Sequence, residues 1–192
     1  MKTTESVCSR NQVVNEYKIV KTLGQGSFGL VSLVQTDNLR RFAMKAIRKT
    51  KIKPGGAKKD ITTEMEVLKK LVHRNVIKLH EILDDPSSDD IFLIMDFLEG
   101  GTLQDLLQAS EAGLQEKNVR EYFRQLISAV HYCHEVANIA HRDIKPENMM
   151  LDKAGQMILC DFGVSQFFEN GTDLLKGTVG SFRFMAPEVV SP

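Results

Sequence analysis

Apolar and polar residues alternate along much of the first half of the chain, as they do in β-strands. The stretches YKIVKTLG, GLVSLVQT and RFAMKAIR, at residues 17–24, 29–36 and 41–48, follow this alternation and are separated by turn-forming residues. Two further candidates, VIKLHEIL at 76–83 and IFLIMDFL at 91–98, flank the polar turn DDPSSDD. The pattern predicts five strands, the first three of them antiparallel.

A helical period replaces the alternation in two parts of the chain. The first is DITTEMEVLKKLV at residues 60–72, where Asp60 is the candidate N-cap. The apolar residues of its predicted buried face are Met65, Leu68, Leu71 and Val72. The second comprises TLQDLLQA at 102–109 and VREYFRQLISAVHYCHEV at 119–136. We therefore expect a sheet-rich first lobe with one helix and a helical second lobe, which meet near residues 96–101.

The composition is that of an ordinary globular protein, with 42% apolar and 26% charged residues. The 25 basic and 25 acidic residues cancel, which argues against a nucleic acid or a membrane as the partner. Three scattered cysteines, Cys8, Cys133 and Cys160, fit neither a disulfide framework nor a zinc site and indicate a reducing compartment. The start has no signal-peptide core, and no stretch approaches the about 20 apolar residues of a membrane span. We expect a location in the cytoplasm or nucleus, and a loose polar arm at residues 1–16.

A glycine-rich loop, GQGSFGLV, runs from Gly24 to Val31 between the first two predicted strands. Glycines let backbone N–H groups close on phosphate oxygens because no Cβ holds them away. A glycine-rich hairpin without a ligand is the simpler interpretation of this loop alone. A Rossmann dinucleotide loop is excluded because a strand, rather than a helix, follows the glycines.

Lys45 stands alone in an otherwise apolar predicted strand. A buried lysine is costly unless it is paired with an anion. Glu64, in the predicted helix that follows, is the candidate partner. For a lysine considered in isolation, an exposed position at a strand edge is the favoured alternative.

The segment IAHRDIKPENMML gathers several chemically active side chains between apolar stretches, and its proline predicts a loop. The residues concerned are His141, Arg142, Asp143, Lys145 and Asn148. Such a loop can bring together a proton acceptor, a cation that neutralises phosphate and a metal-binding amide.

A second segment of this kind is ILCDFGVS, where Asp161 follows an apolar strand and precedes a glycine. A hard oxygen ligand for Mg²⁺ fits this position. Taken alone, each of these segments is more often a solvated loop. Their order and spacing together decide the interpretation.

In that order, the motifs resemble those of eukaryotic protein kinases: G-x-G-x-x-G-x-V, the A-M-K lysine, H-R-D-I-K-P-E-N, D-F-G and the A-P-E at residues 186–188. The resemblance begins at about Tyr17 and reaches the last residue. It implies an α+β, bilobal protein-kinase-like fold. Residues 17–98 would form a five-stranded antiparallel first lobe with one helix, and residues 99–192 the first part of a helical second lobe.

The resemblance implies a role for each motif residue. Lys45 would hold the α- and β-phosphates of ATP, with Glu64 fixing it in place. Asp143 would orient the substrate hydroxyl and accept its proton, and Lys145 would stabilise the transferring phosphoryl group. A lysine two residues after that aspartate resembles the serine/threonine kinases, so we expect an ATP-dependent serine/threonine protein kinase.

The cofactors implied are ATP and Mg²⁺, with Asn148 and Asp161 as the metal ligands. In the family ATP lies between the lobes, under the glycine loop. Asp96 to Leu98 would form the hinge that meets the adenine edge, with Met95 as the gatekeeper. The implied nucleotide-binding residues are Leu23, Gly24, Gln25, Gly26, Ser27, Phe28, Gly29, Val31, Ala43, Lys45, Asp96, Leu98 and Met150.

Residues 161–188 correspond to the activation segment of the family. By the resemblance, Ser181 would face the catalytic aspartate and lysine. Thr178 would be the regulatory phosphorylation site, and Arg142 the cation that receives its phosphate. The segment most resembles that of the calcium/calmodulin-dependent kinase kinases, which implies a protein substrate such as another kinase, and an upstream activator.

The kinase fold normally continues past A-P-E with further helices, so we expect the chain to be truncated at its C-terminus relative to a complete kinase. Two functional hypotheses follow. In the first, the sequence is that of a serine/threonine kinase whose activity belongs to a longer chain. In the second, it is an inactive, nucleotide-binding or scaffolding product. Loss of activity by point substitution is excluded because every catalytic motif residue is intact.

Overall fold

The computed structural model describes residues 13–25, 29–49, 61–86, 88–168, 175 and 178–190. By its internal contacts the chain forms two compact units. The first comprises Met1–Ile52 and Leu79–Phe97, and the second comprises Lys53–Lys78 and Leu98–Pro192. Some residues singled out in the sequence lie outside the described part: Cys8, Gly26, Ser27, Phe28 and Asp60.

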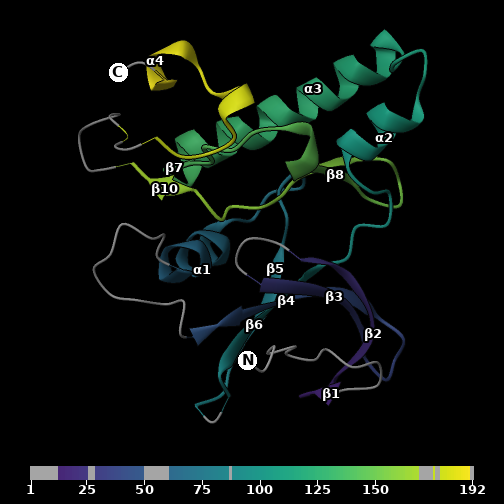
Figure 1. The fold of residues 1–192 in the computed structure, drawn as a ribbon, viewed down its shortest axis with the longest axis vertical. Helices are drawn as coiled ribbons and strands as arrows, with labels where there is room; N and C mark the ends of the chain where they lie inside the picture. The colour runs from purple at the N-terminus through teal and green to yellow at the C-terminus, as the bar shows by residue number, and fades with distance from the viewer. Residues whose placement is uncertain are drawn as a thin grey trace, which may run out of the picture. The chain divides into compact units, whose positions relative to one another are not determined.

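The first unit is a curled antiparallel sheet (Figure 1). Among the described residues it has six strands in the order β1-β2-β3-β4-β6-β5. Their bounds are β1 Val13–Val14, β2 Tyr17–Gln25, β3 Gly29–Gln35, β4 Arg41–Arg48, β5 Leu79–Asp84 and β6 Asp90–Asp96. The five predicted strands are present. β1 is an additional one, because Val13 and Val14 pair with Lys18 and Tyr17 where we expected a loose arm.

The cross-strand register assigns two sets of side chains to opposite faces of this sheet. One set forms a buried apolar cluster of Tyr17, Ile19, Val34, Phe42, Met44 and Ile94. Pairing of Val31 with Lys45, and of Ala43 with Met95, places these four residues on the other face, because paired residues share a face and successive residues alternate. Val31, Ala43 and Lys45, which were all predicted to bind ATP, therefore share one face.

The second unit contains most of the helices. Its helical segments are α1 Ile61–Lys70, α2 Leu103–Ala109, α3 Glu116–His131, the π-helix η2 Tyr132–Val136, the 3₁₀ segments η3 Pro146–Asn148 and η4 Phe182–Phe184, and α4 Pro187–Val190. Its short strands are β7 Ile139–Ala140, β8 Met149–Leu151, β9 Met157–Leu159 and β10 Gln166–Phe167. Strand β7 pairs with β10, and β8 pairs with β9. No helix in the described part of the chain has the length and apolarity needed to cross a membrane.

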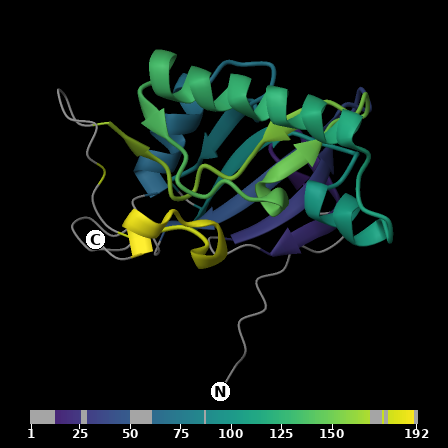
Figure 2. The ribbon, with the colours of Figure 1, turned by 90° about the horizontal axis from the view of Figure 1, so that it is seen from above.

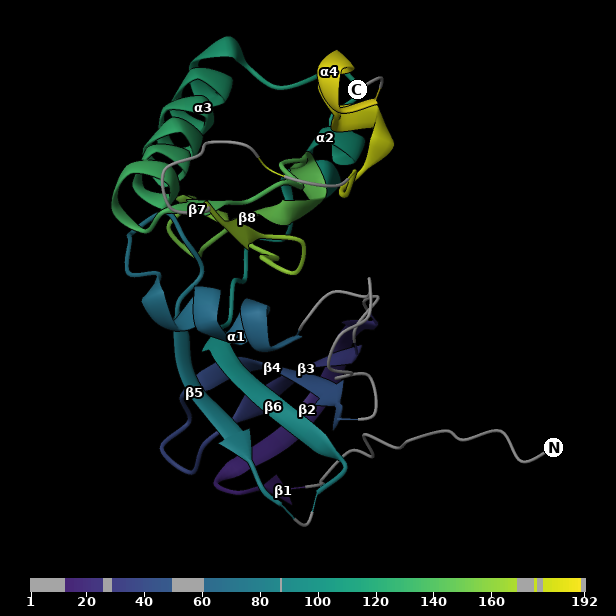
Figure 3. The same ribbon diagram turned by 90° about the vertical axis from the view of Figure 1, so that its left-hand side faces the viewer.

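A small core joins the elements of the second unit that carry its chemistry. Leu103 of α2, Leu151 of β8 and Met157 of β9 are buried together, and Tyr122 and Leu126 of α3 pack against them. Figure 2 shows α3 as the long helix of this unit, and Figures 1 and 3 both show α2 and α3 on the same side of β8. This core therefore supports β8 and the segments that precede and follow it.

Helix α2 begins with a capping box that fits its sequence. The backbone N–H of Asp105 donates to Thr102 Oγ1 at 3.0 Å, and the N–H of Thr102 donates to Asp105 Oδ2 at 2.9 Å. The hydrogen bonds that Asp105 Oδ2 accepts from the backbone N–H and the hydroxyl of Thr102 lower the pKa of the Asp105 carboxyl. The start of α2, next to the boundary between the units, is therefore fixed by its own side chains.

Two expectations for the helical stretches were wrong at their ends. Val72 is 78% exposed, because α1 ends at Lys70 and the chain leaves the helical path before it. The stretch predicted as one helix at 119–136 changes to a π-helix at Tyr132, whose Oη accepts a hydrogen bond from the N–H of Val72 at 2.8 Å. Cys133 is buried within η2, and burial raises the pKa of its thiol to about 11.

The strand predicted to begin at Val76 begins only at Leu79, because the preceding residues pair with β9 of the second unit instead. Val76 forms an isolated parallel bridge with Leu159. The N–H of Leu159 donates to the Asn75 carbonyl, and the N–H of Ile77 donates to the Leu159 carbonyl, both at 2.9 Å. The side chain of Asn75 also donates to the Met157 carbonyl at 2.8 Å. Backbone hydrogen bonds therefore hold this segment on β9.

Candidate active site

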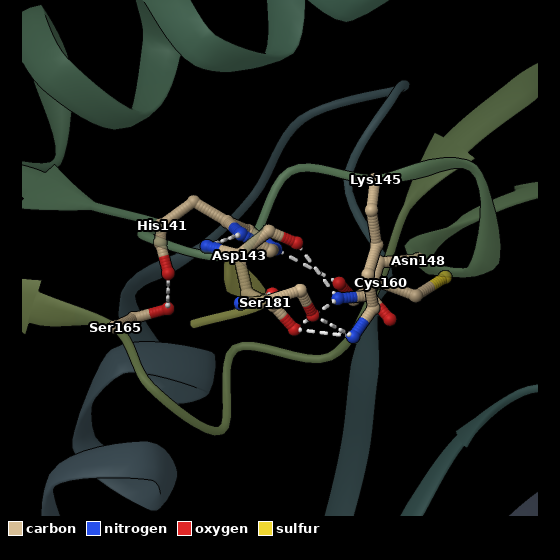
Figure 4. A network of polar contacts seen from close by, with 7 residues as sticks. All are labelled: His141, Asp143, Lys145, Asn148, Cys160, Ser165 and Ser181. Carbon is tan, nitrogen blue, oxygen red and sulfur yellow. Dashed lines mark hydrogen bonds and ion pairs between the residues drawn. The ribbon is translucent and has the colours of Figure 1, made fainter. Parts of the chain in front are cut away.

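Asp143 is the centre of a polar cluster in the second unit (Figure 4). Its Oδ2 lies 2.8 Å from Lys145 Nζ and accepts a hydrogen bond from Asn148 Nδ2 at 2.9 Å. Its Oδ1 accepts the backbone N–H of Ser181 at 2.8 Å. Burial by itself raises the pKa of this carboxyl, but the hydrogen bonds from Lys145, Ser181 and Asn148 outweigh burial and lower it. Asp143 is therefore ionised at neutral pH.

Lys145 contacts both Asp143 and Ser181. Besides its contact with Asp143, its Nζ donates to Ser181 Oγ at 2.7 Å. An ammonium group has three N–H donors, so one more acceptor can still be served. Ser181 thus lies against both Asp143 and Lys145, in the position that the family resemblance implied.

Asn148 is buried, and hydrogen bonds fix the orientation of its amide. Nδ2 donates to both the carbonyl oxygen of Asp143, at 2.8 Å, and its Oδ2, at 2.9 Å. Because both partners are acceptors, the NH₂ group must face them, and Oδ1 must point away from Asp143. A neutral amide oxygen held in this way is a suitable ligand for Mg²⁺.

Asp161, the second predicted metal ligand, is the neighbour in sequence of a residue that is hydrogen-bonded to Asn148. The backbone N–H of Cys160, the residue before it, donates to the Asn148 carbonyl at 2.8 Å. Asp161 itself is exposed and has a φ of 56° in the left-handed region, which is uncommon for a residue with a Cβ. The Asp161 carboxylate is exposed, the Asn148 amide oxygen is fixed, and a backbone hydrogen bond joins the two segments that carry them. These oxygen donors fit Mg²⁺.

His141 is buried and links the catalytic loop to the residues before Asp161. Its Nδ1 accepts the backbone N–H of Asp143 at 3.2 Å, and its Nε2 lies 2.8 Å from the Cys160 carbonyl oxygen. The first contact requires an unprotonated Nδ1, so the ring is neutral and donates from Nε2. The His141 carbonyl also accepts Ser165 Oγ at 3.2 Å. His141 was named in the sequence only as part of its motif, without this role.

Arg142 is held by the segment that follows D-F-G. Its φ is 69°, and its Nη1 donates to Oε1 of Gln166 in β10. Burial lowers the pKa of the guanidinium. Thr178, the predicted phosphorylation site, is exposed, and its hydroxyl donates to the Val189 carbonyl at 3.4 Å. Nothing in the sequence pattern indicated the contact with Gln166.

Gly180 makes the close approach that brings Ser181 to Asp143. Its φ is 108°, and a Cβ at this position would lie 2.3 Å from the Arg142 carbonyl oxygen. A side chain is therefore excluded both by the backbone conformation and by space. This residue was missed in the sequence, because a glycine in a glycine-rich segment carries no signal of what it touches.

The predicted nucleotide-binding residues fall in both units. Leu23, Gly24, Gln25, Gly29, Val31, Ala43, Lys45 and Asp96 lie in strands of the first unit, and Leu98 and Met150 belong to the second. Lys45 and Glu64 are both buried, with 9% and 5% of their surface exposed. Because Lys45 belongs to the first unit and Glu64 to the second, their ion pair stays a prediction.

A protein-family model described as "Protein kinase domain" matches residues 17–192. CBL-interacting protein kinase 8 of Oryza sativa subsp. japonica is 37% identical over 179 residues, which are 93% of this chain and 39% of that protein. SNF1-related protein kinase catalytic subunit alpha KIN12 of Arabidopsis thaliana is 37% identical over 191 residues, 99% of this chain and 37% of that protein. NUAK family SNF1-like kinase 2 of Homo sapiens is 35% identical over 182 residues, 95% of this chain and 28% of that protein. The chain thus spans less than half the length of these relatives.

Proposed function

The chain belongs to the protein kinase domain family, and from this premise we propose that the protein transfers the γ-phosphoryl group of Mg-ATP to a serine or threonine hydroxyl of a protein substrate. The arrangement around Asp143 carries the proposal. An ionised carboxylate lies 2.8 Å from the Lys145 ammonium, next to an amide oxygen suited to a metal ion. The serine/threonine specificity is supported by the lysine two residues after Asp143, and by relatives such as CBL-interacting serine/threonine-protein kinase 24 of Arabidopsis thaliana.

Asp143 would bind the substrate hydroxyl through its carboxylate and orient its oxygen toward the phosphorus atom. Its lowered pKa makes it a weak base, so orientation would be its main contribution. The proton would pass to the carboxylate as the hydroxyl oxygen bonds to the γ-phosphorus and the bond from that phosphorus to the leaving ADP breaks, when the hydroxyl has become acidic enough to give the proton up. The hydrogen bonds from Asn148 and Ser181 would keep the carboxylate in one rotamer during this step.

Lys145 would stabilise the negative charge on the transferring phosphoryl group. Its ammonium is held at one position by Asp143 and Ser181, so no reorganisation is needed as charge develops. The Ser181 hydroxyl would set that position. A neighbouring cation of fixed geometry is worth more in such a site than a mobile one.

Asn148 and Asp161 would hold Mg²⁺, which when bound neutralises phosphate charge. In the first unit, Lys45 would neutralise phosphate oxygens of ATP, and Val31 and Ala43 would pack on the adenine from the face that they share. Met150 would contribute a further apolar contact. Glu64 would be the partner of Lys45.

Regulation and group membership remain proposals of the same kind. A phosphate on Thr178, added by an upstream kinase, would be received by Arg142. We retain the calcium/calmodulin-dependent kinase kinase group as the prediction from the activation segment, although the relatives named above are CBL-interacting and SNF1-like kinases. The cytoplasm or nucleus stays the predicted location.

The test is transfer of labelled phosphate from Mg-ATP to peptides that contain serine, threonine or tyrosine. We expect transfer to the first two, and a loss of about a thousandfold in kcat for Asp143→Asn with ATP binding retained. Asp89→Asn, an exposed residue in the turn between β5 and β6, is the matched control and should keep full activity. Binding of ATP with no transfer by the unaltered protein would favour the inactive, scaffolding alternative.

A further inference from the structure

Arg142 has a backbone conformation that needs support from its surroundings. A φ of 69° in a residue with a Cβ costs of order 1 kcal/mol, and it persists only where neighbouring groups hold it. The residue immediately precedes Asp143, so its backbone sets the direction in which the Asp143 side chain leaves the loop. Whatever holds Arg142 therefore also sets the geometry of the carboxylate.

Gln166, in the segment after D-F-G, supports Arg142 through a hydrogen bond. Its Oε1 accepts a hydrogen bond from Arg142 Nη1. Hydrogen bonds between a neutral acceptor and a charged donor are stronger than those between neutral groups. Because the guanidinium is partly buried and its pKa is lowered by burial, an acceptor at this place also offsets the loss of hydration.

Gln166 is itself fixed to the chain that leads into the catalytic loop. It pairs with Ala140 in the β7–β10 ladder, two residues before Arg142. On one side of it, Ser165 Oγ donates to the His141 carbonyl at 3.2 Å. On the other side, the N–H of Phe168 donates to the Asn138 carbonyl at 3.0 Å. The amide acceptor is thus held in register with the catalytic loop on both sides.

The acceptor that Gln166 offers to Arg142 is an uncharged amide, and the Thr178 hydroxyl donates to the Val189 carbonyl. We propose that Gln166 is a positioning residue that holds Arg142, and through it Asp143, before any phosphate is added to the chain. The inference rests on the proposed function. It deepens the regulation of that site, since a phosphate on Thr178 would then add to an arrangement that already exists.

The test uses the protein after treatment with a broad-specificity phosphatase, with the absence of phosphate verified by mass spectrometry. Gln166→Leu removes the acceptor at similar size, and Gln166→Glu keeps an oxygen acceptor for Arg142. Gln108→Leu, at an exposed position in α2, is the matched control. The readouts are kcat and KM for ATP, the number of ATP-binding sites and the melting temperature.

We expect the dephosphorylated protein to be active, and Gln166→Leu to lower kcat about tenfold with KM for ATP unchanged. Gln166→Glu should restore kcat to within about threefold. A loss of fold would instead lower the melting temperature and the number of ATP-binding sites together. Activity of Gln166→Leu within about twofold of the unaltered protein, or failure of Gln166→Glu to restore it, would overturn the inference.

A second measurement does not depend on activity. Hydrogen–deuterium exchange of the peptide spanning the catalytic loop reports its backbone hydrogen bonds, among them the one from the Asp143 N–H to His141 Nδ1. Exchange should be about tenfold faster in Gln166→Leu and unchanged in Gln108→Leu. If the unaltered protein transfers no phosphate, the proposed function fails. Equal exchange in all variants would then refute the inference separately.

Discussion

The sheet of the first unit and the polar cluster around Asp143 are stabilised by different interactions. In the sheet, Val34, Met44 and Ile94 are at most 1% exposed and belong to one apolar cluster. In the cluster, Asp143 is held by three donors, and its surroundings include backbone conformations that are unfavourable in isolation, at Arg142 and Asp161. The apolar contacts of the sheet therefore stabilise the fold, whereas the polar cluster fixes the geometry of Asp143 at a cost in stability.

This difference predicts two kinds of response to substitution. Truncation of a buried apolar side chain in the sheet should lower the free energy of unfolding and leave the chemistry of the folded molecules unchanged. Substitution in the cluster should lower kcat with a small effect on unfolding, because the residues there contact the reacting groups or set their positions. The predictions that follow test this division, in order of decreasing effect.

Ile94→Ala in β6 should lower the free energy of unfolding of the first unit by about 3 kcal/mol, because it leaves a cavity in the apolar cluster. The measurement is urea unfolding followed by circular dichroism. Val20→Ala, at a residue of β2 that is 39% exposed, is the control and should cost less than about 0.5 kcal/mol. If Ile94→Ala also lowered kcat per folded molecule more than about threefold, the proposed separation between stability and chemistry would be wrong.

Gly180→Ala should lower kcat by about thirtyfold, because the new Cβ would meet the Arg142 carbonyl and push Ser181 away from Asp143. Gly113→Ala separates this clash from the cost of the backbone conformation. Gly113 has a φ of 75°, and a Cβ there would meet nothing within 4 Å. Both variants should lose stability through the backbone conformation, Gly180→Ala more because of the clash, and only Gly180→Ala should lose activity. Equal kcat in the two variants would show that the close approach has no part in the chemistry.

The sheet could be predicted from the sequence because its faces follow a period of two. Strand β4 has the predicted bounds, Arg41–Arg48. The errors lie where backbone partners decide the outcome. Residues 76–78 belong to the stretch predicted as a strand from Val76, yet Val76 forms a bridge with Leu159 of β9, and the N–H of Ile77 donates to the Leu159 carbonyl. A pattern within one segment holds no information about such a partner.

The sequence pattern grouped Asp143, Lys145 and Asn148 in one loop, and the family resemblance assigned a role to each of them. Gly180 and Gln166 escaped notice for a physical reason. The importance of Gly180 comes from a carbonyl oxygen 38 positions earlier, and that of Gln166 from a guanidinium 24 positions earlier. Neither contact leaves a periodic signal in the sequence, so both were found only in the structure.

Ser181→Ala should lower kcat by about tenfold. The substitution removes the hydroxyl that accepts from Lys145 Nζ at 2.7 Å, and it keeps the backbone N–H that donates to Asp143 Oδ1 at 2.8 Å. Ser181→Thr retains a hydroxyl and should stay within about threefold of the unaltered protein. Steady-state kinetics at saturating Mg-ATP measures both. A threonine variant as slow as the alanine variant would indicate that the hydroxyl does not position Lys145.

The smallest effect we expect is a change in stability with pH that originates at Asp143. Its pKa is lower in the folded protein than its ordinary value of 3.8, so the unfolded chain takes up a proton before the folded one does. The stabilisation that accompanies the lowered pKa is therefore fully present above about pH 5 and is lost as the pH falls through the folded pKa. The difference in free energy of unfolding between the unaltered protein and Asp143→Asn should be constant from about pH 7 to 5 and shift against the unaltered protein below that range.

In a Lys145→Met background, the loss of stability in acid that originates at Asp143 should be smaller. Removal of the ammonium leaves burial, which raises the pKa of the carboxyl, less opposed. Urea unfolding at each pH measures the difference. A difference independent of pH in the protein that retains Lys145 would mean that the hydrogen bonds around Asp143 place its carboxylate without stabilising its charge.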